Sequence, residues 1–173
     1  MESLASTDTM QEFTAFYESD HNRLTWFLAR TGAPPTEAED VAQEAMLVLL
    51  KTWPTVRAPH AFVRTVALRM LYRGWDERKR SLDAEQRSAS RKAWLETFDA
   101  NEDVDAALDL LGSLPTAQRE VFALHTDGFS EKEIAEITGK KEATVRSTLR
   151  HARDKAKSVL HPDHDREGGN HGP

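Results

Sequence analysis

The chain lacks cysteine altogether, and this absence removes several kinds of site from consideration. Without thiols it can form neither a disulfide nor a thiolate-ligated zinc site, and it can carry no redox switch of its own. No apolar run approaches the roughly 20 residues that cross a bilayer. The acidic N-terminus lacks the basic and then apolar pattern of a signal peptide. These absences predict a soluble protein of the reducing cytoplasm with no contact to a membrane.

Several sequence motifs of enzymes are also missing. The chain has no pair of Glu-x-x-His motifs, no Gly-rich phosphate loop and no Gly-x-Ser-x-Gly turn. His161, His164 and His171 lie among Gly, Pro and polar residues, so we expect a disordered tail over 161–173 rather than a metal site. An enzyme is therefore the weakest functional hypothesis, and we expect neither a cofactor nor a metal.

The overall net charge of −6 argues against a polyanionic partner, but the charge is unevenly distributed along the chain. The segment Arg57–Lys92 has 10 basic and 4 acidic residues, and Lys140–Lys157 has 7 and 2. Two separated cationic segments can contact two stretches of a nucleic acid, because each neutralised phosphate adds counterion-release energy. The acidic segments around them suggest a basic protein partner.

The second basic segment has the pattern of a helix-turn-helix. Ser130 and Glu133 predict a capping box at the start of a first helix, and Gly139 can adopt the left-handed conformation that ends it. A second helix from about Glu142 is predicted to bury Val145, Leu149 and Ala152. Its outward side chains are Thr144, Arg146, Ser147, Arg150 and Arg153. Such a helix fits the major groove of DNA, although a solvated basic face on an ordinary helical hairpin is the alternative interpretation.

The N-terminal half predicts three further helices. The first covers residues 10–29, and a second runs from a capping box at Thr36 and Glu39 to about Trp53. The third, over residues 60–80, directs Phe62, Val66, Met70 and Leu71 inward and leaves its arginines outside. Tyr72 and Trp75 lie among these arginines. Basic residues interleaved with aromatic ones are typical of single-stranded nucleic-acid binding, but core aromatics with solvated cations are equally compatible with the pattern.

These elements predict an all-α protein of two small helical domains joined by a flexible linker. The predicted domains are residues 1–80 and 104–160, with the linker at 81–103. The apolar cluster of Trp94, Leu95 and Phe98 in the linker is interpreted as a short packed helix, with an apolar surface covered by a protein partner as the alternative. A linker of roughly 20 residues could span about 70 Å, which is nearly two turns of DNA.

Four segments in this order and spacing resemble the extracytoplasmic-function class of bacterial sigma factors over most of the chain. They are EAEDVAQEAMLVLLKTW, the Pro-bracketed loop after it, AFVRTVALRMLYRGWDERKR, and SLPTAQREVFALHTDGFSEKEIAEITGKKEATVRSTLRHAR. The resemblance implies that the first domain docks on core RNA polymerase and melts the −10 promoter element, whereas the second reads the −35 element. It implies no covalent chemistry.

The resemblance also implies roles for individual residues. The polymerase-docking residues would be Asp40, Gln43, Glu44 and Leu47. The −10 contacts would be Arg57, His60, Arg64, Arg69, Tyr72, Arg73 and Trp75. The −35 contacts would be Lys141, Glu142, Thr144, Arg146, Ser147, Arg150 and Arg153. Three positions depart from the common family pattern: Arg69 and Arg73 stand where Asn and Asp are expected, and Thr148 replaces a usual cation.

The partners implied are core RNA polymerase, promoter DNA and, as is usual in the family, an inhibitory anti-sigma protein, with a monomer expected when the protein is free. A stand-alone helix-turn-helix regulator is the alternative function. It would need only the second domain and usually a dimer. The basic and aromatic residues of the first domain argue against it.

Overall fold

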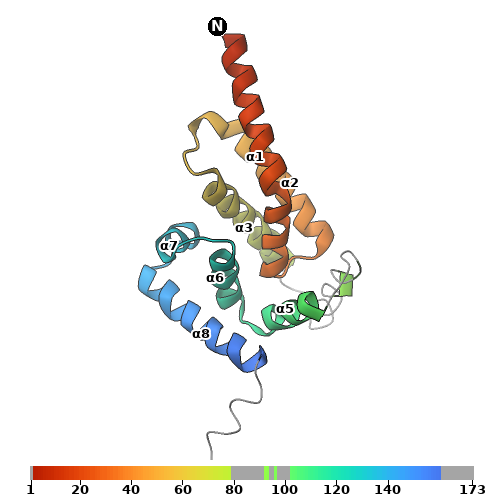
Figure 1. Cartoon of the computed structure of the whole chain (residues 1–173), viewed down its shortest axis with the longest axis vertical. Helices are drawn as coiled ribbons and strands as arrows, with labels where there is room; N and C mark the ends of the chain where they lie inside the picture. Colours follow the sequence, from red (N-terminus) through yellow and green to blue (C-terminus); the bar gives the residue numbers. More distant parts are fainter. Residues whose placement is uncertain (1, 79–91, 94–95, 97–101, 161–173) are drawn as a thin grey trace, which may run out of the picture.

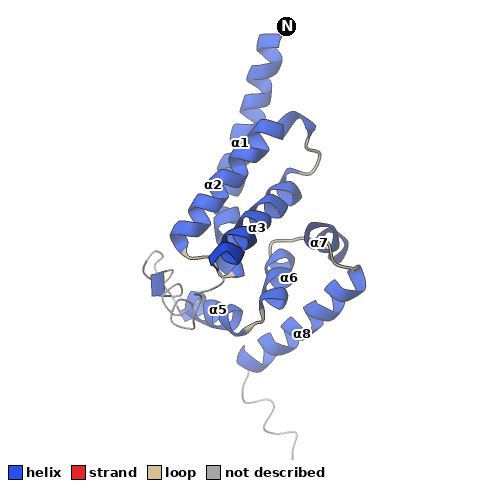
Figure 2. Cartoon of the chain, turned by 180° about the vertical axis from the view of Figure 1, so that it is seen from behind, coloured by secondary structure: helices blue, strands red, loops and turns tan. Residues whose placement is uncertain are grey.

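The computed structural model describes residues 2–78, 92–93, 96 and 102–160, which form helices and connecting turns without a β-strand (Figures 1 and 2). The N-terminal module contains α1 (Glu2–Thr31), α2 (Pro35–Thr52), the short 3-10 helix η1 (Trp53–Thr55) and α3 (Pro59–Arg78). The C-terminal module contains α5 (Glu102–Ser113), α6 (Thr116–Thr126), α7 (Glu131–Thr138) and α8 (Glu142–Leu160). The predicted all-α fold is confirmed. None of the described helices has the combination of length and apolar character needed to span a membrane.

Helix α1 is longer than the sequence predicted, beginning at Glu2 instead of near residue 10. The apolar stripe that signals burial begins only at Phe13, which is buried. No proline or glycine stands before Phe13 in the sequence, so nothing stops the helix from continuing toward the N-terminus. The first turns of α1 extend past the other helices in Figure 1. Periodicity therefore located the buried part of α1 but not its beginning.

Helix α2 begins with a proline rather than with the predicted capping box. Its N-cap residue is Pro34, whose side chain makes no capping hydrogen bond, and Pro35 is the first helical residue. Proline suits this position because its fixed φ matches the helix and its missing N–H would have no helical partner. Thr36 is thus already inside the helix, and the predicted capping role of Thr36 is wrong.

Helix α3 buries a different face from the one predicted. Of the residues predicted to face inward, Phe62, Val66 and Met70 are only half-buried, and only Leu71 is fully buried. The fully buried side follows Val63, Ala67 and Leu71. Both sets repeat every four residues, so the period alone could not choose between them. The rotation of about one residue has a chemical consequence: it brings a charged side chain, Arg64, into the interior.

One apolar core extends through both modules. It contains the buried faces of α1, α2 and α3 and continues into Val121, Leu124, Ile134, Val145 and Leu149 of the C-terminal module. A smaller cluster of Leu111, Leu114, Ala152 and Phe122 joins α5, α6 and α8. The modules meet where α6 packs on α1 and where α7 packs on α3. Most of the predicted linker, including Trp94, Leu95 and Phe98, lies outside the described residues, and α5 already begins at Glu102.

Candidate nucleic-acid interface

The helix-turn-helix is built from local signals that the structure satisfies. At the start of α7 the Ser130 backbone N–H donates to Glu133 Oε2 at 2.8 Å, and the Glu133 N–H donates to Ser130 Oγ at 3.3 Å. The hydrogen bonds from the Ser130 hydroxyl and N–H hold the pKa of the Glu133 carboxyl below its ordinary value. Gly139 ends α7 with a left-handed φ of +68°. The predicted capping box and glycine stop are both confirmed.

Helix α8 presents a polar face to solvent and an apolar face to the core. Val145, Leu149 and Ala152 are fully buried, as predicted. The exposed residues of this face and of the turn before it are Lys141, Glu142, Thr144, Arg146, Ser147, Arg150 and Arg153. Arg153 is exposed but also donates from Nη2 to His125 Nε2 of α6 at 2.8 Å. All of the predicted −35 residues are therefore accessible in this structure.

Arg146 is held along one edge by two carboxylates. Its Nε lies 3.1 Å from Glu131 Oε2, and its Nη2 lies 3.2 Å from Glu142 Oε1. These two nitrogens share one edge of the planar guanidinium, so the edge formed by Nη1 and the second Nη2 hydrogen faces away from the carboxylates. That edge has the geometry for bidentate pairing with guanine. Glu131 was not singled out from the sequence, because its position in the first turn of α7 is explained by the helix dipole alone.

The loop before α3 lies opposite the helix-turn-helix across a groove of about 540 Å³. Arg57 and its neighbours form one wall, and Glu133, Glu136 and Ile137 of α7 form the other. His60, on the first turn of α3, is exposed. The centre of its ring lies 4.9 Å from that of Phe16, with the two rings tilted by 60°, and its Nδ1 lies 3.1 Å from Asp20 Oδ1. Arg57 and His60 are thus accessible, as expected.

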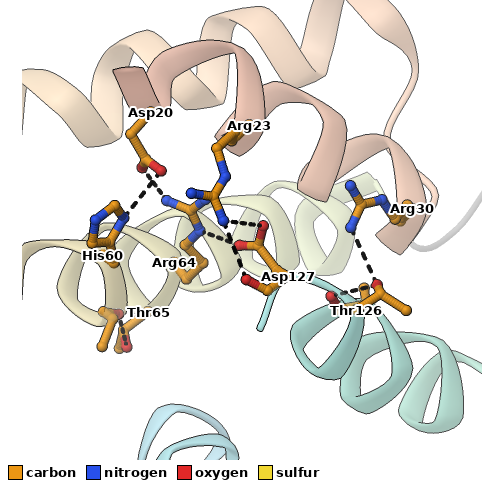
Figure 3. A network of polar contacts seen from close by, with 10 residues as sticks. Asp20, Arg23, Arg30, His60, Arg64, Thr65, Thr126 and Asp127 are labelled. Atoms are coloured by element: carbon orange, nitrogen blue, oxygen red, sulfur yellow. Dashed lines mark hydrogen bonds and ion pairs between the residues drawn. The ribbon is translucent and has the colours of Figure 1, made fainter. Parts of the chain in front are cut away.

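Arg64 is not on the surface, and the prediction that it lies outside as a DNA contact is wrong for this structure. Its side chain is fully buried and pairs through Nη1 with Asp20 and through Nε with Asp127 Oδ2 at 2.8 Å. Its guanidinium also lies 5.9 Å from the centre of the Phe27 ring. Figure 3 shows Arg64 directed between α1 and the turn after α6, so it joins the two modules.

Tyr72 and Trp75 of α3 are half-buried and hydrogen-bonded. Tyr72 donates to Glu120 Oε2 of α6 at 2.6 Å, and burial, followed by the Glu120 carboxylate, raises the pKa of the Tyr72 hydroxyl. Trp75 Nε1 donates to Glu37 Oε2 at 3.3 Å. Arg69 and Arg73 of the same helix are exposed. The structure therefore brings only part of the predicted −10 surface to solvent.

Helix α2 separates an exposed polar face from an alanine-rich buried face. Asp40, Gln43 and Glu44 are exposed, and Leu47, also exposed, retains 55% of its accessible surface. The opposite side buries Ala38, Ala42, Ala45, Met46 and Leu49. An exposed leucine beside two carboxylates suits a partner with both basic and apolar character.

Comparison with known proteins identifies the two modules. Residues 16–81 match the family model "Sigma-70 region 2", and residues 105–155 match "Sigma-70, region 4". Together the two matches cover more than half of the chain. The chain belongs to the sigma-70 family. It is a sigma factor of the extracytoplasmic-function class, as its sequence motifs indicated, and it directs promoter-specific transcription.

Relatives and solved structures agree with this assignment. The sigma factor is 27% identical to the ferric citrate uptake sigma factor FecI of Escherichia coli (strain K12), over 93% of this chain and 94% of that protein. Its fold matches the sigma factor RpoE of Bartonella quintana, solved with the anti-sigma factor NepR, with a TM-score of 0.70 and 19% identity over 88% of this chain and 99% of the other. It also matches CnrH, solved with the cytosolic domain of CnrY, with a TM-score of 0.64 and 20% identity over 93% and 95%.

The residues that sequence reasoning missed are those that join the modules. Asp20, Glu120 and Asp127 are acidic residues in helices or turns, and nothing in their local pattern distinguishes them from solvated carboxylates. Only the packing of α6 against α1 and α3 reveals their partners. Within the described ranges, no three potential metal ligands gather at one place. His161, His164 and His171 lie outside those ranges.

Proposed function

We propose that this sigma factor reads the −35 element with the exposed face of α8. The supporting observation is the orientation of this helix: its apolar side is anchored by Val145 and Leu149, so the N-terminal polar side chains project together from the surface. Arg146 and Arg150 supply cations for guanine or phosphate, and Thr144 and Ser147 supply hydroxyls. A recognition helix docks in the major groove in this manner.

In the same proposal, the exposed face of α2 docks on core RNA polymerase. Asp40 and Glu44 stand one turn apart, an arrangement that is mildly unfavourable in an isolated helix. A basic partner surface relieves this repulsion, and Leu47 adds an apolar contact. Arg57, His60, Arg69 and Arg73, with Tyr72 and Trp75, capture the unwound −10 strand through phosphate contacts and base stacking.

Two further parts of the proposal concern cellular context. The protein works in the cytoplasm, because the polymerase and the promoter are its partners. An anti-sigma protein restrains it. This part of the proposal rests on analogy with RpoE, solved with the anti-sigma factor NepR, and with CnrH, solved with the cytosolic domain of CnrY.

A run-off transcription assay with purified sigma factor, core polymerase and a matched promoter tests the proposal. We expect Arg150→Ala to reduce promoter-specific initiation about tenfold or more, since one lost arginine contact to a base or phosphate costs about 1–3 kcal/mol. Its affinity for core polymerase should stay at the wild-type value. Lys155→Ala, which removes an exposed cation of α8 outside the proposed contacts, is the matched control.

The docking role is tested by charge reversal. We expect Asp40→Lys to weaken binding to core polymerase in a pull-down, whereas Glu12→Lys, the same reversal at an exposed position of α1, should leave binding unchanged. Equal core affinity for wild type and Asp40→Lys would rule out the α2 face as the docking site. Loss of core binding by Arg150→Ala would rule out the assignment of α8 to the promoter.

A further inference from the structure

Arg146 is held by carboxylates from both helices of the helix-turn-helix. Its Nε donates to Glu131 Oε2 of α7 at 3.1 Å, and its Nη2 donates to Glu142 Oε1 of α8 at 3.2 Å. The Glu142 contact joins two residues one turn apart on the same helix, whereas the Glu131 contact crosses from one helix to the other. We call Glu131 and Glu142 the arginine clamp. The clamp orients the guanidinium relative to the whole motif and not only to α8.

The position of Glu131 is itself fixed by the fold of the motif. Glu131 is the first residue of α7 and directly follows Ser130, the N-cap residue of the capping box. Its backbone therefore lies in a turn whose end is closed by hydrogen bonds. Ile134 of α7 and Val145 of α8 are both fully buried, which holds the two helices together. The clamp is thus built on ordered elements, as a preorganised recognition site requires.

The clamp determines which edge of Arg146 is offered to a ligand. The two carboxylates occupy the edge formed by Nε and one Nη2 hydrogen, so Nη1 and the second Nη2 hydrogen point away from them. This outer pair of donors matches the two acceptors of guanine, O6 and N7, in the major groove. A phosphate approaching the same guanidinium would meet the negative charge of Glu131 and Glu142 beside it. The arrangement therefore favours a base edge over the DNA backbone.

The clamp has two opposing effects on DNA binding. Its negative charge repels phosphates and lowers the affinity for every sequence alike. Its order raises the affinity only for a matching sequence, because an arginine already held in place loses less rotamer freedom on binding. The side chain of Arg146 is 63% exposed and that of Glu131 is 34% exposed. An ion pair so open to solvent changes an equilibrium by a factor of up to about five.

Arg150, one turn further along α8, provides a contrast. It is exposed, and among the described residues no ion pair includes it. An arginine without fixed neighbours can follow a phosphate in many orientations, which supports affinity but carries no sequence information. Arg146 and Arg150 are therefore distinguished by their surroundings and not by residue type.

We propose that Glu131 is a specificity-determining residue of this sigma factor, which positions Arg146 to read a guanine of the −35 element. Glu131 acts through Arg146 and not by touching the DNA. This inference rests on the proposed function of α8 as the −35 reader. It adds the chemical identity of one recognised base and the residue that orients its reader.

The test uses the full-length sigma factor assembled with core polymerase. Fragments of the promoter used in the run-off assay, with the −35 region randomised over about one turn of DNA or roughly 10 base pairs, are selected by binding and sequenced. Glu131→Ala removes the charge and the acceptor, whereas Glu131→Gln removes the charge but keeps an acceptor oxygen. Glu136→Ala, which removes an exposed carboxylate from the same helix, is the matched control.

We expect the wild type and Glu136→Ala to enrich guanine at one position, and Arg146→Ala to reduce that preference about tenfold or more. Glu131→Ala should reduce the guanine preference about three- to fivefold while raising the affinity for unselected DNA about twofold. Glu131→Gln should match Glu131→Ala in its affinity for unselected DNA but keep more of the guanine preference. In the Arg146→Ala background, Glu131→Ala should reduce the preference no further, because the two residues act as one unit.

Each other outcome would overturn a defined part of the proposal. An unchanged guanine preference in Glu131→Ala, or an equal loss in Glu136→Ala, would refute the role of Glu131. Equal loss in Glu131→Ala and Glu131→Gln would reduce the effect to charge, and equal weakening on all sequences would reduce it to a structural role. A loss that persists without Arg146 would mean that Glu131 acts on the DNA directly. If the wild type selects no −35 sequence, the proposed function itself fails, whereas selection without guanine would refute only the present inference.

Discussion

Arg64 illustrates how one buried side chain joins packing and electrostatics. A guanidinium taken out of water loses several kcal/mol of hydration, which only well-placed partners can offset. Here it has the carboxylates of Asp20 and Asp127 and the face of the Phe27 ring. Because each buried partner depends on the others, the group is far more sensitive to loss of one member than a surface ion pair would be.

We predict that Arg64→Met destabilises the protein by about 3–5 kcal/mol, since Asp20 and Asp127 would lose their buried partner. The measurement is the free energy of unfolding by urea, monitored by circular dichroism. Arg73→Met removes an exposed arginine from the same helix and should change stability by no more than about 0.5 kcal/mol. Similar values for the two variants would mean that Arg64 does not have the buried setting described above.

The sequence could not locate Arg64 because α3 carries two apolar rows at the same spacing. Phe62, Val66 and Met70 repeat every four residues, and so do Val63, Ala67 and Leu71. The first row is bulkier and was taken as the buried one, together with Leu71 of the second row. The actual choice depends on the acidic partners Asp20 and Asp127, which lie 44 and 63 positions away from Arg64 in sequence. A local pattern contains no information on such distant pairing.

At the scale of elements, the helix-turn-helix depends on the sharp stop of α7. Gly139 has a φ of +68°, and a Cβ built there meets nothing within 4 Å. The cost of a side chain at this position is therefore conformational and not steric.

We predict that Gly139→Ala lowers the free energy of unfolding by about 1–2 kcal/mol and weakens −35 binding, since the angle between α7 and α8 depends on this residue. Gly139→Asn should lose less, because asparagine tolerates the left-handed region better. The control is Gly112→Ala in α5, where a Cβ also meets nothing within 4 Å but φ is not positive. There we expect a gain of about 0.5–1 kcal/mol. Thermal unfolding and fluorescence anisotropy with duplex DNA measure the two effects, and equal losses at both glycines would contradict this account.

The helices whose ends were predicted well are those with capping residues or a glycine stop at their ends. The start and stop of α7 were predicted because Ser130, Glu133 and Gly139 act on backbone groups within a few residues. The start of α1 was misplaced because no such signal exists there, and helix formers simply continue. At α2 two signals competed, and the proline pair took precedence over the Thr36 and Glu39 pattern. Helix ends are therefore predicted most reliably where capping residues act on backbone groups nearby in sequence.

At the scale of the whole molecule, the sequence did not predict that one apolar core runs through both modules. Composition and charge predicted two helical domains and a polar connection, but not their association. The interface combines apolar residues such as Leu124 and Ile134 with the partners of Arg64 and Tyr72. Such association depends on complementarity between surfaces far apart in the chain. The exposed basic face of α8 was predictable because it faces solvent and needs no such complementarity.

Cooperative unfolding provides a whole-molecule prediction. With one core shared by both modules, we expect wild-type protein to unfold in a single calorimetric transition whose van't Hoff and calorimetric enthalpies agree. Asp127→Asn with Glu120→Gln should divide this into two transitions, the first from the C-terminal module, because a helical unit of roughly 60 residues is only marginally stable alone. Glu12→Gln with Asp154→Asn should retain one transition. Two transitions in the wild type would show that the modules fold independently and that their contacts contribute little to stability.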